Sequence, residues 1–256
     1  MSQSAPEPVT LAPSVPVSAI GEAGALQLLE HGELEVLGRM VSASNATLYC
    51  AVTLDGVTAA CVHKPVAGER PLWDFPDGTL AAREVAAYRL SAATGWDVVP
   101  PTVLRDGPWG TGMCQLWVDV DAGCDLIALL NSDDDRVRRM AVFDSLVNNA
   151  DRKGGHLLPT AEGHLYGIDH GVCFAVPDKL RTLLWRWAGR PLPAEASDML
   201  AGLLARWDAA AGPVLSGLLA ADEVTATRGR IAALLRSGVH PSPREDGWPA
   251  VPWPPF

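Results

Sequence analysis

The feature that most constrains the fold is an Asp-Gly pair at positions 55 and 56, set between two strand-like segments. Residues 46–54 (ATLYCAVTL) and 57–64 (VTAACVHK) are rich in β-branched and small apolar side chains. An Asp-Gly pair between such segments favours the two-residue turn of a β-hairpin, because that turn needs positive φ angles. Further strand-like stretches lie at 33–40 and 97–120. The sequence therefore predicts a sheet in its N-terminal half.

The second half of the chain is patterned for helices. One helix is expected earlier, over 79–95, with Thr79 as N-cap and Gly95 as its stop. Beyond about residue 124, helical patterns predominate, interrupted by a short hairpin over 156–171. Further helices are expected over 133–150, 179–189, 194–210 and 222–238. Strands followed by helices predict an α+β protein with two lobes.

We divide the chain on this pattern. Residues 1–20 are rich in Pro, Ser and Ala and are expected to be disordered. A β-rich N-terminal lobe is expected over 21–118, and a helical C-terminal lobe over 119–240. The Pro/Trp-rich tail, 241–256, is either a polyproline ligand for a partner or a segment lying along the folded domain. We expect the second arrangement.

Composition and charge narrow the partners and the location. The 256 residues carry a formal net charge of −10, which disfavours binding to nucleic acid or to an anionic membrane. No apolar run approaches the roughly 18 residues of a membrane span, and the first twenty residues lack the basic start of a signal peptide. The five cysteines have no C-x-x-C spacing, so reduced core thiols are expected. We expect a cytoplasmic protein without stable membrane anchoring.

One acid stands where a core residue is expected. In the helix over 133–150, Val137, Met140, Asp144 and Val147 fall on one face. The other residues of this face are apolar, so Asp144 is an anomaly that the helical pattern does not explain.

Two further charged residues lie in otherwise apolar elements. Lys64 ends the strand-like segment 57–64, and Glu84 lies among alanines in the helix over 79–95. Taken singly, Lys64 would be an edge lysine with its ammonium in solvent, and Glu84 a solvent-facing charge. Together, a strand lysine followed by a helix glutamate is the arrangement with which protein kinases aim the lysine at nucleotide phosphates.

Two aspartates follow in loops. Asp151 comes directly after a helix and before Gly154 and Gly155, which permit a tight, non-helical path. Asp169 follows a short strand and precedes a glycine. Each alone would be an ordinary charged turn residue. As a pair on adjacent loops, one carboxylate can accept the proton of a hydroxyl while the other holds Mg²⁺ against phosphates.

These residues carry a resemblance to a known family. The segments NNADRKGGHLL (148–158) and YGIDHGVCF (166–174) resemble the catalytic and metal loops of the phosphatidylinositol 3- and 4-kinase superfamily, which read roughly D-R-H-x-x-N and I-D-F-G. Residues 61–90 are similar to the lysine strand and following helix of type II lipid kinases, and uncharacterised actinobacterial kinase-like proteins look closer still. The resemblance spans roughly 33–190 and implies a protein-kinase-like fold that uses ATP and Mg²⁺, with Mn²⁺ as an alternative.

The resemblance also implies roles. Lys64 would contact the phosphates and Glu84 would pair with it. Asp151 would be the catalytic base, and Asp169 the main metal ligand. Arg152, beside the base, would neutralise or brace it.

Two departures from the family pattern affect the metal site. His156 stands where the family has a second metal-binding asparagine, and imidazole is a softer ligand than Mg²⁺ prefers. Asn149 is a candidate substitute, although its spacing differs. His170 replaces the phenylalanine of the I-D-F-G pattern. These departures leave a pseudoenzyme open.

The nucleotide contacts in the first half are assigned by position. Ser44, in the segment 41–47 between the first two strands, would bind phosphate, although an ordinary polar hairpin explains this segment equally well. Gln115, Trp117 and Val118 fall where a hinge would face adenine.

The sequence thus predicts an ATP-dependent phosphotransferase of the lipid-kinase-like, atypical type. Its acceptor would be a hydroxyl of an unidentified protein, lipid or small molecule. The alternative is a nucleotide-binding pseudokinase with a regulatory or scaffold role. A third reading is a domain unrelated to kinases in which the four charged positions coincide by chance.

Overall fold

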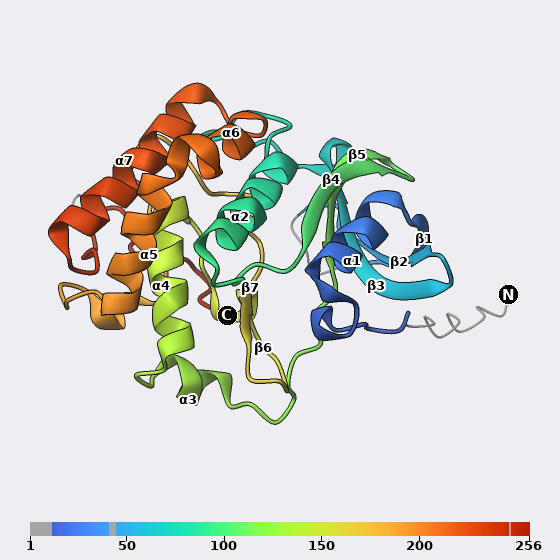
Figure 1. Cartoon of the computed structure of the whole chain (residues 1–256), viewed down its shortest axis with the longest axis horizontal. Helices are drawn as coiled ribbons and strands as arrows, with labels where there is room; N and C mark the ends of the chain where they lie inside the picture. The colour runs from blue at the N-terminus through green and yellow to red at the C-terminus, as the bar shows by residue number, and fades with distance from the viewer. Residues whose placement is uncertain (1–11, 41–44, 246) are drawn as a thin grey trace, which may run out of the picture. The chain divides into compact units, whose positions relative to one another are not determined.

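The computed structural model describes residues 12–40, 45–245 and 247–256, and divides the chain into two compact units (Figure 1). Unit 1 comprises residues 1–70 and 101–117, and unit 2 comprises residues 71–100 and 118–256. Unit 1 contains the large sheet, and unit 2 contains most of the helices. The predicted α+β class is therefore confirmed.

Unit 1 is built on a five-stranded antiparallel sheet in the order β1-β2-β3-β5-β4. Its strands are β1 (Glu33–Arg39), β2 (Leu48–Leu54), β3 (Val57–Pro65), β4 (Thr102–Gly107) and β5 (Gly110–Leu116). The predicted hairpin is confirmed, since Leu54 pairs with Val57 and both turn residues have positive φ. Strand β3, which ends with Lys64 and Pro65, lies between β2 and β5.

Helix α1 (Val17–His31) packs on one face of this sheet, as Figure 1 shows within unit 1. Its buried side chains, among them Leu28 and Leu29, join Val52 and Cys61 in a hydrophobic core. The prediction of disorder over 1–20 is wrong for the described part, because Ile20 packs on this core and Ala60 N–H donates to Pro13 O at 2.8 Å. The compositional rule missed the apolar residues spaced among the prolines. Residues 1–11 lie outside the described part of the chain.

Unit 2 is mainly helical and also holds a small hairpin. Its elements are α2 (Leu80–Thr94), α3 (Leu126–Leu130), α4 (Asp135–Val147), β6 (Leu157–Pro159), β7 (Leu165–Gly167), α5 (Ala194–Ala205), α6 (Ala211–Ser216) and α7 (Ala221–Ser237). Helix α7 contacts α4 and α5, while α2 contacts α5 and α6. The hairpin predicted over 156–171 is confirmed by the antiparallel pairing of β6 with β7.

Helix α2 belongs to unit 2, although its residues were expected in the N-terminal lobe over 21–118. Arg83 is buried and donates to Cys173 O at 2.7 Å and to Glu223 Oε1 of α7 at 2.5 Å. A buried guanidinium needs such partners, because leaving it unpaired in the protein interior is costly. These bonds anchor α2, and with it Glu84, among the helices of unit 2.

The prediction of a helix over 179–189 is wrong. The structure has only a 3₁₀ turn there, Trp185–Trp187. The backbone before this turn is extended and pairs with the loop after α4: Arg181 N–H donates to Asn149 O at 2.9 Å, and Arg152 N–H donates to Arg181 O at 3.1 Å. A helix would use these groups internally, so the tertiary pairing overrides the local pattern.

The cysteines agree with the expected core thiols. All five are free, and every one except Cys124 is buried. Burial raises the pKa of the Cys173 thiol well above its usual value, so this side chain stays protonated at neutral pH. Within the described ranges, no helix has both the length and the apolar character to cross a membrane.

A buried histidine makes the stability of unit 2 depend on pH. Burial, reinforced by Arg138, lowers the pKa of His240 from 6.5 to about 4. Between pH 6.5 and about 4, His240 therefore binds a proton in the unfolded chain but not in the folded chain. Stability from neutral His240 is complete above pH 6.5 and is lost as the pH falls toward 4. The expected loss is about 3 kcal/mol, measured by urea unfolding across this range.

The matched variant for this prediction is His240→Gln, compared with the natural chain at each pH. The glutamine variant should lose less stability between pH 6.5 and 4, because it has no imidazole to titrate. Equal losses in the two proteins would contradict the assignment to His240.

Candidate active site

The two loops predicted to carry chemistry lie side by side in unit 2. The Asp151 loop (148–156) follows α4, and the Asp169 loop (168–174) follows β7. Ala150 N–H donates to Val172 O at 3.1 Å, and Ile168 N–H donates to His156 O at 2.9 Å. These backbone bonds join the loops at two points.

The Asp151 loop starts at a fixed helix end. Asn148 caps α4 in the left-handed conformation, with φ 54° and ψ 53°, which asparagine tolerates better than most residues. Its side-chain amide donates to Ala175 O and Pro177 O, and its side-chain oxygen accepts from Lys179 N–H. The chain therefore leaves α4 in one defined direction.

Arg152 is the hub of the site. It is fully buried and ion-paired with Asp144, with Nη2 2.9 Å from Oδ1 and Nε 3.1 Å from both carboxylate oxygens. Its Nη1 donates to Ile168 O at 2.8 Å, which ties the two loops together. Burial acts to lower the pKa of Arg152, but the pKa is raised overall, with the Asp144 carboxylate as the main opposing cause. A guanidinium without exposed surface touches no substrate, so this geometry favours bracing over a direct catalytic role.

Asp144 also explains the position of Asn149. The Asn149 side chain donates to Asp144 Oδ1 at 3.1 Å, and its oxygen accepts from Asp151 N–H at 2.9 Å. Both ends of this buried amide are therefore engaged in holding the backbone at Asp151. Asn149 acts here as a link between Asp144 and Asp151, which accounts for its place before the predicted base.

The Asp151 carboxylate is partly exposed and ion-paired. Lys153 Nζ lies 3.1 Å from Asp151 Oδ2. The ammonium lies on the same loop, two residues further on, and brings a positive charge to the predicted base. A carboxylate and an ammonium at this point suit the binding of an acceptor hydroxyl and of phosphate oxygens, respectively.

Asp169 and His156 form the second pair. His156 Nε2 lies 3.3 Å from Asp169 Oδ2, and Lys153 N–H donates to His156 Nδ1. Asp169 adopts a left-handed backbone with φ 63°, a strained conformation of the kind that concentrates at functional sites. Burial lowers the pKa of His156, although Asp169 opposes this, so the imidazole is neutral at neutral pH.

The ligand atoms that Asp169 and His156 offer suit a divalent cation. Neighbouring ligands of an octahedral ion with bonds of about 2.1 Å lie about 3 Å apart, close to the 3.3 Å between Asp169 and His156. Within the described ranges, no group of three or more His, Cys, Asp or Glu side chains gathers to hold a metal. Mg²⁺ at phosphoryl-transfer sites needs only one or two protein ligands, since waters and substrate phosphates complete its shell.

Glu84 reaches the Asp169 loop from α2. Its carboxylate is buried, and Oε2 accepts from His170 N–H at 2.8 Å. The His170 ring packs edge-on against Phe143, as an aromatic residue would, and its Nε2 lies 2.7 Å from Arg152 Nη2. Because a guanidinium can only donate, neutral His170 accepts this bond. His170 thus combines the packing of the expected phenylalanine with a link to Arg152.

Among the predicted site residues, unit 2 brings together Glu84, Asp151, Arg152, His156 and Asp169. Lys64 and Gln115 lie in unit 1, in β3 and β5. Strand neighbours alternate between faces, and Cys61 and Cys114 pack under α1, so Lys64 and Gln115 project from the opposite face. The pairing of Lys64 with Glu84 stays a prediction.

The remaining hinge and phosphate assignments have different outcomes. Trp117 N–H donates to Ala60 O at 3.0 Å, so this group is engaged inside unit 1. Val118 is the first residue of unit 2 after the sheet. Ser44 lies outside the described residues.

Sequence reasoning missed three contributors to the site, Asp144, Lys153 and the side chain of His170. Asp144 gave a signal as an acid on the apolar face of α4, and His170 gave one as the residue that replaces the expected phenylalanine. A buried Arg partner eight residues further on explains the signal at Asp144. The roles of Lys153 and His170 depend on loop geometry, which sequence spacing does not define.

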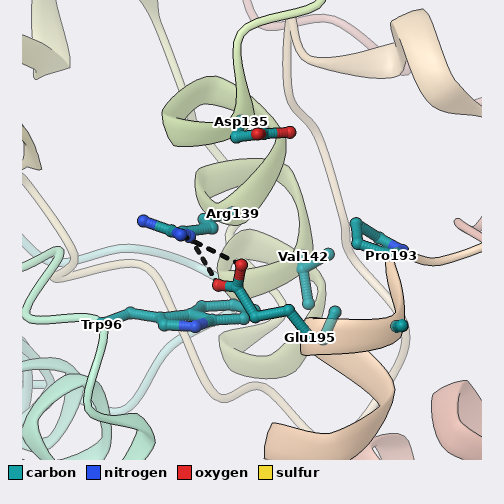
Figure 2. A pocket seen from close by; sticks show the side chains of 8 residues that line it. Trp96, Asp135, Arg139, Val142, Pro193 and Glu195 are labelled. Carbon is teal, nitrogen blue, oxygen red and sulfur yellow. Dashed lines mark hydrogen bonds and ion pairs between the residues drawn. The ribbon is translucent and has the colours of Figure 1, made fainter.

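A separate pocket of about 240 Å³ lies in unit 2 and contains none of the predicted site residues. Figure 2 shows Arg139 of α4 and Glu195 of α5 above the Trp96 ring, with Val142, Pro193 and Asp135 around them. The Arg139–Glu195 pair has bonds of 2.6 and 3.0 Å, and it lowers the pKa of Glu195. Because these two charged side chains pair with each other, their main role is to link α4 to α5.

Sequence comparison places this chain among known proteins. No protein-family model matches it. It is 46% identical over 267 residues to Protein Rv2133c of Mycobacterium tuberculosis, an alignment that covers 90% of this chain and 94% of that protein. The chain belongs to the Rv2133c family. A mycobacterial relative agrees with the actinobacterial branch expected from the sequence.

This chain also shares part of its sequence with plant phosphatidylinositol 4-kinases. The chain is 31% identical over 137 residues to phosphatidylinositol 4-kinase gamma 4 of Oryza sativa, covering 46% of this chain. It spans only about a quarter of that plant enzyme, 24% of its length. Among solved structures, hydra Fam20 with sugar has a TM-score of 0.51 at 12% identity, covering 84% of this chain and 87% of that one. That likeness concerns the fold alone. The chain is therefore similar over part of its sequence to a phosphatidylinositol 4-kinase and in its fold to hydra Fam20.

Proposed function

We propose that this protein is an ATP-dependent phosphotransferase that moves the γ-phosphate of ATP to a hydroxyl acceptor. The observation that supports it most is the pair of partly exposed carboxylates, Asp151 and Asp169, on two loops joined by one buried arginine. Phosphoryl transfer depends mainly on positioning and on charge neutralisation. Two carboxylates on joined loops supply the positioning and can hold the cation that neutralises the phosphates.

Each polar group of the site has a part in this reaction. Asp151 accepts the proton of the acceptor hydroxyl, and Lys153, 3.1 Å away, attracts the transferring phosphate. Asp169 and His156 hold the divalent cation. The cation, when bound, neutralises the phosphate oxygens. Arg152, with Asp144 behind it, keeps the two loops in register. Lys64 of unit 1 is the proposed contact to the other phosphates.

A second function, nucleotide binding without turnover, is favoured by one observation. Lys153 N–H donates to Nδ1 of neutral His156, so the imidazole proton lies on Nε2 and faces Asp169 Oδ2. In this arrangement His156 is a hydrogen-bond donor to the carboxylate that is proposed to hold the metal. A pseudokinase that senses nucleotide would keep this bond.

Two measurements on the full chain separate these functions. ADP formation from ATP is followed with Mg²⁺ or Mn²⁺, and the melting temperature is compared with and without metal-nucleotide. Turnover supports the phosphotransferase, and a thermal shift without turnover supports the pseudokinase. The absence of both effects would contradict the two proposals together.

The metal preference gives a further prediction. His156→Asn replaces a nitrogen ligand by the amide oxygen that hard cations prefer. We expect the ratio of Mg²⁺-supported to Mn²⁺-supported turnover to rise by about threefold to tenfold in this variant. The exposed residue Asn131 offers a control, since Asn131→His should leave the ratio unchanged. An unchanged ratio in His156→Asn would show that His156 does not bind the metal.

A further inference from the structure

The Asp151 loop is held from outside by the C-terminal segment 247–256. Gly154 N–H, within the loop, donates to Pro255 O at 2.8 Å. The Phe256 ring covers Gly154 so closely that a Cβ at position 154 would overlap it. The Pro/Trp-rich tail thus lies along the folded domain, as the sequence analysis expected.

The same segment holds the extended stretch that pairs with the Asp151 loop. Thr182 N–H donates to Ala250 O at 3.0 Å, Trp185 Nε1 donates to the same oxygen at 3.0 Å, and Arg181 Nε donates to Pro249 O at 2.9 Å. Thr182 is also bridged to Arg152. Three stretches of chain therefore lie next to one another, each hydrogen-bonded to the next: the backbone at Arg152, the stretch 181–185 and the C-terminal segment.

We infer that segment 247–256 is a brace that positions the Asp151 loop for phosphoryl transfer, an inference that rests on the proposed function. The loop needs such support because Gly154 and Gly155 give it wide conformational freedom. The segment does not act as a plug within unit 2. With it in place, the Asp151 and Asp169 side chains remain 32% and 48% exposed. Its contacts are made to loop backbone and leave both carboxylates accessible.

Two adjacent glycines provide a matched test. Gly154→Ala places a methyl group where the Phe256 ring lies, whereas a Cβ at Gly155 meets nothing within 4 Å. Amide hydrogen exchange at Arg152 and at position 154 is expected to quicken by at least about tenfold in Gly154→Ala. It should stay unchanged in Gly155→Ala. The kcat for ATP turnover should fall at least about fivefold relative to Gly155→Ala, with KM for ATP unchanged. A general loss of stability would lower the melting temperature, so an unchanged melting temperature distinguishes a local effect on the loop from partial unfolding.

The tail side of the contact gives a second variant that should fold normally. Phe256 is largely exposed, and Phe256→Ala should quicken exchange at the same two amides. In the double variant the methyl group at 154 finds room, so Gly154→Ala should add little to Phe256→Ala.

The outcomes separate this inference from the proposed function. Unchanged exchange in both single variants would refute the brace, whatever the turnover. Faster exchange with an unchanged kcat would show that the brace does not serve the reaction. Faster exchange in a protein whose natural chain has no turnover would refute the proposed function and leave the contact as a structural support of the loop.

Discussion

Asp151→Asn is expected to lower ATP-dependent phosphoryl transfer by about 10²- to 10⁴-fold, because the amide cannot accept the proton of the acceptor hydroxyl. The substitution keeps the size of the side chain and leaves the backbone bond from position 151 to Asn149 Oδ1 intact. The side chain is also partly exposed, so the melting temperature should change little. ADP formation under saturating ATP and metal measures the effect.

Two further variants make this result specific. Asp178→Asn changes an exposed aspartate of unit 2 that is not part of the site, and its turnover should equal that of the natural chain. Asp169→Asn should weaken the metal-dependent thermal shift caused by nucleotide, because it removes a cation ligand. Asp151→Asn should keep that shift. If Asp151→Asn retained full turnover, Asp151 would not be the base.

The sequence could predict those features of the site that depend on the order of neighbouring helices, strands and loops along the chain. Asp151 follows a helix and Asp169 follows a short strand, and both features are visible in the pattern of the chain. Their proximity follows from the hairpin β6–β7, whose strands lie between them. Asp144 was detectable as an anomaly because a charged side chain among core residues requires a partner. The sequence does not identify Arg152 as this partner, because the two side chains meet only where the Asp151 loop folds back onto α4.

The part that could not be predicted depends on contacts between distant segments. Helix α2 belongs to unit 2 because Arg83 pairs with Glu223, 140 positions away in the sequence. The stretch 179–189 has the composition of a helix, but its backbone pairs with the Asp151 loop and with the C-terminal segment. Local propensity is a weak influence, and a few tertiary hydrogen bonds reverse it.

The buried ion pair under the loops gives the largest expected effect on stability. Asp144→Leu leaves the Arg152 guanidinium inside the protein without its carboxylate and removes the acceptor of Asn149. Breaking a buried pair in this way costs about 3–5 kcal/mol of unfolding free energy. Urea unfolding at neutral pH measures the loss. Turnover should fall as well, because Asn149 no longer holds the backbone of Asp151.

A double-variant cycle tests whether this loss belongs to the pair. Arg152→Met removes the charge that Asp144→Leu strands, so the two changes together should cost at least about 1 kcal/mol less than the sum of the single losses. The exposed Arg139–Glu195 pair of Figure 2 offers the same chemistry in solvent, with side chains 40% and 50% exposed. Arg139→Met and Glu195→Leu should each cost no more than about 1 kcal/mol. Additive losses at Asp144 and Arg152 would mean that the guanidinium is held by Ile168 O and His170 without need of the carboxylate.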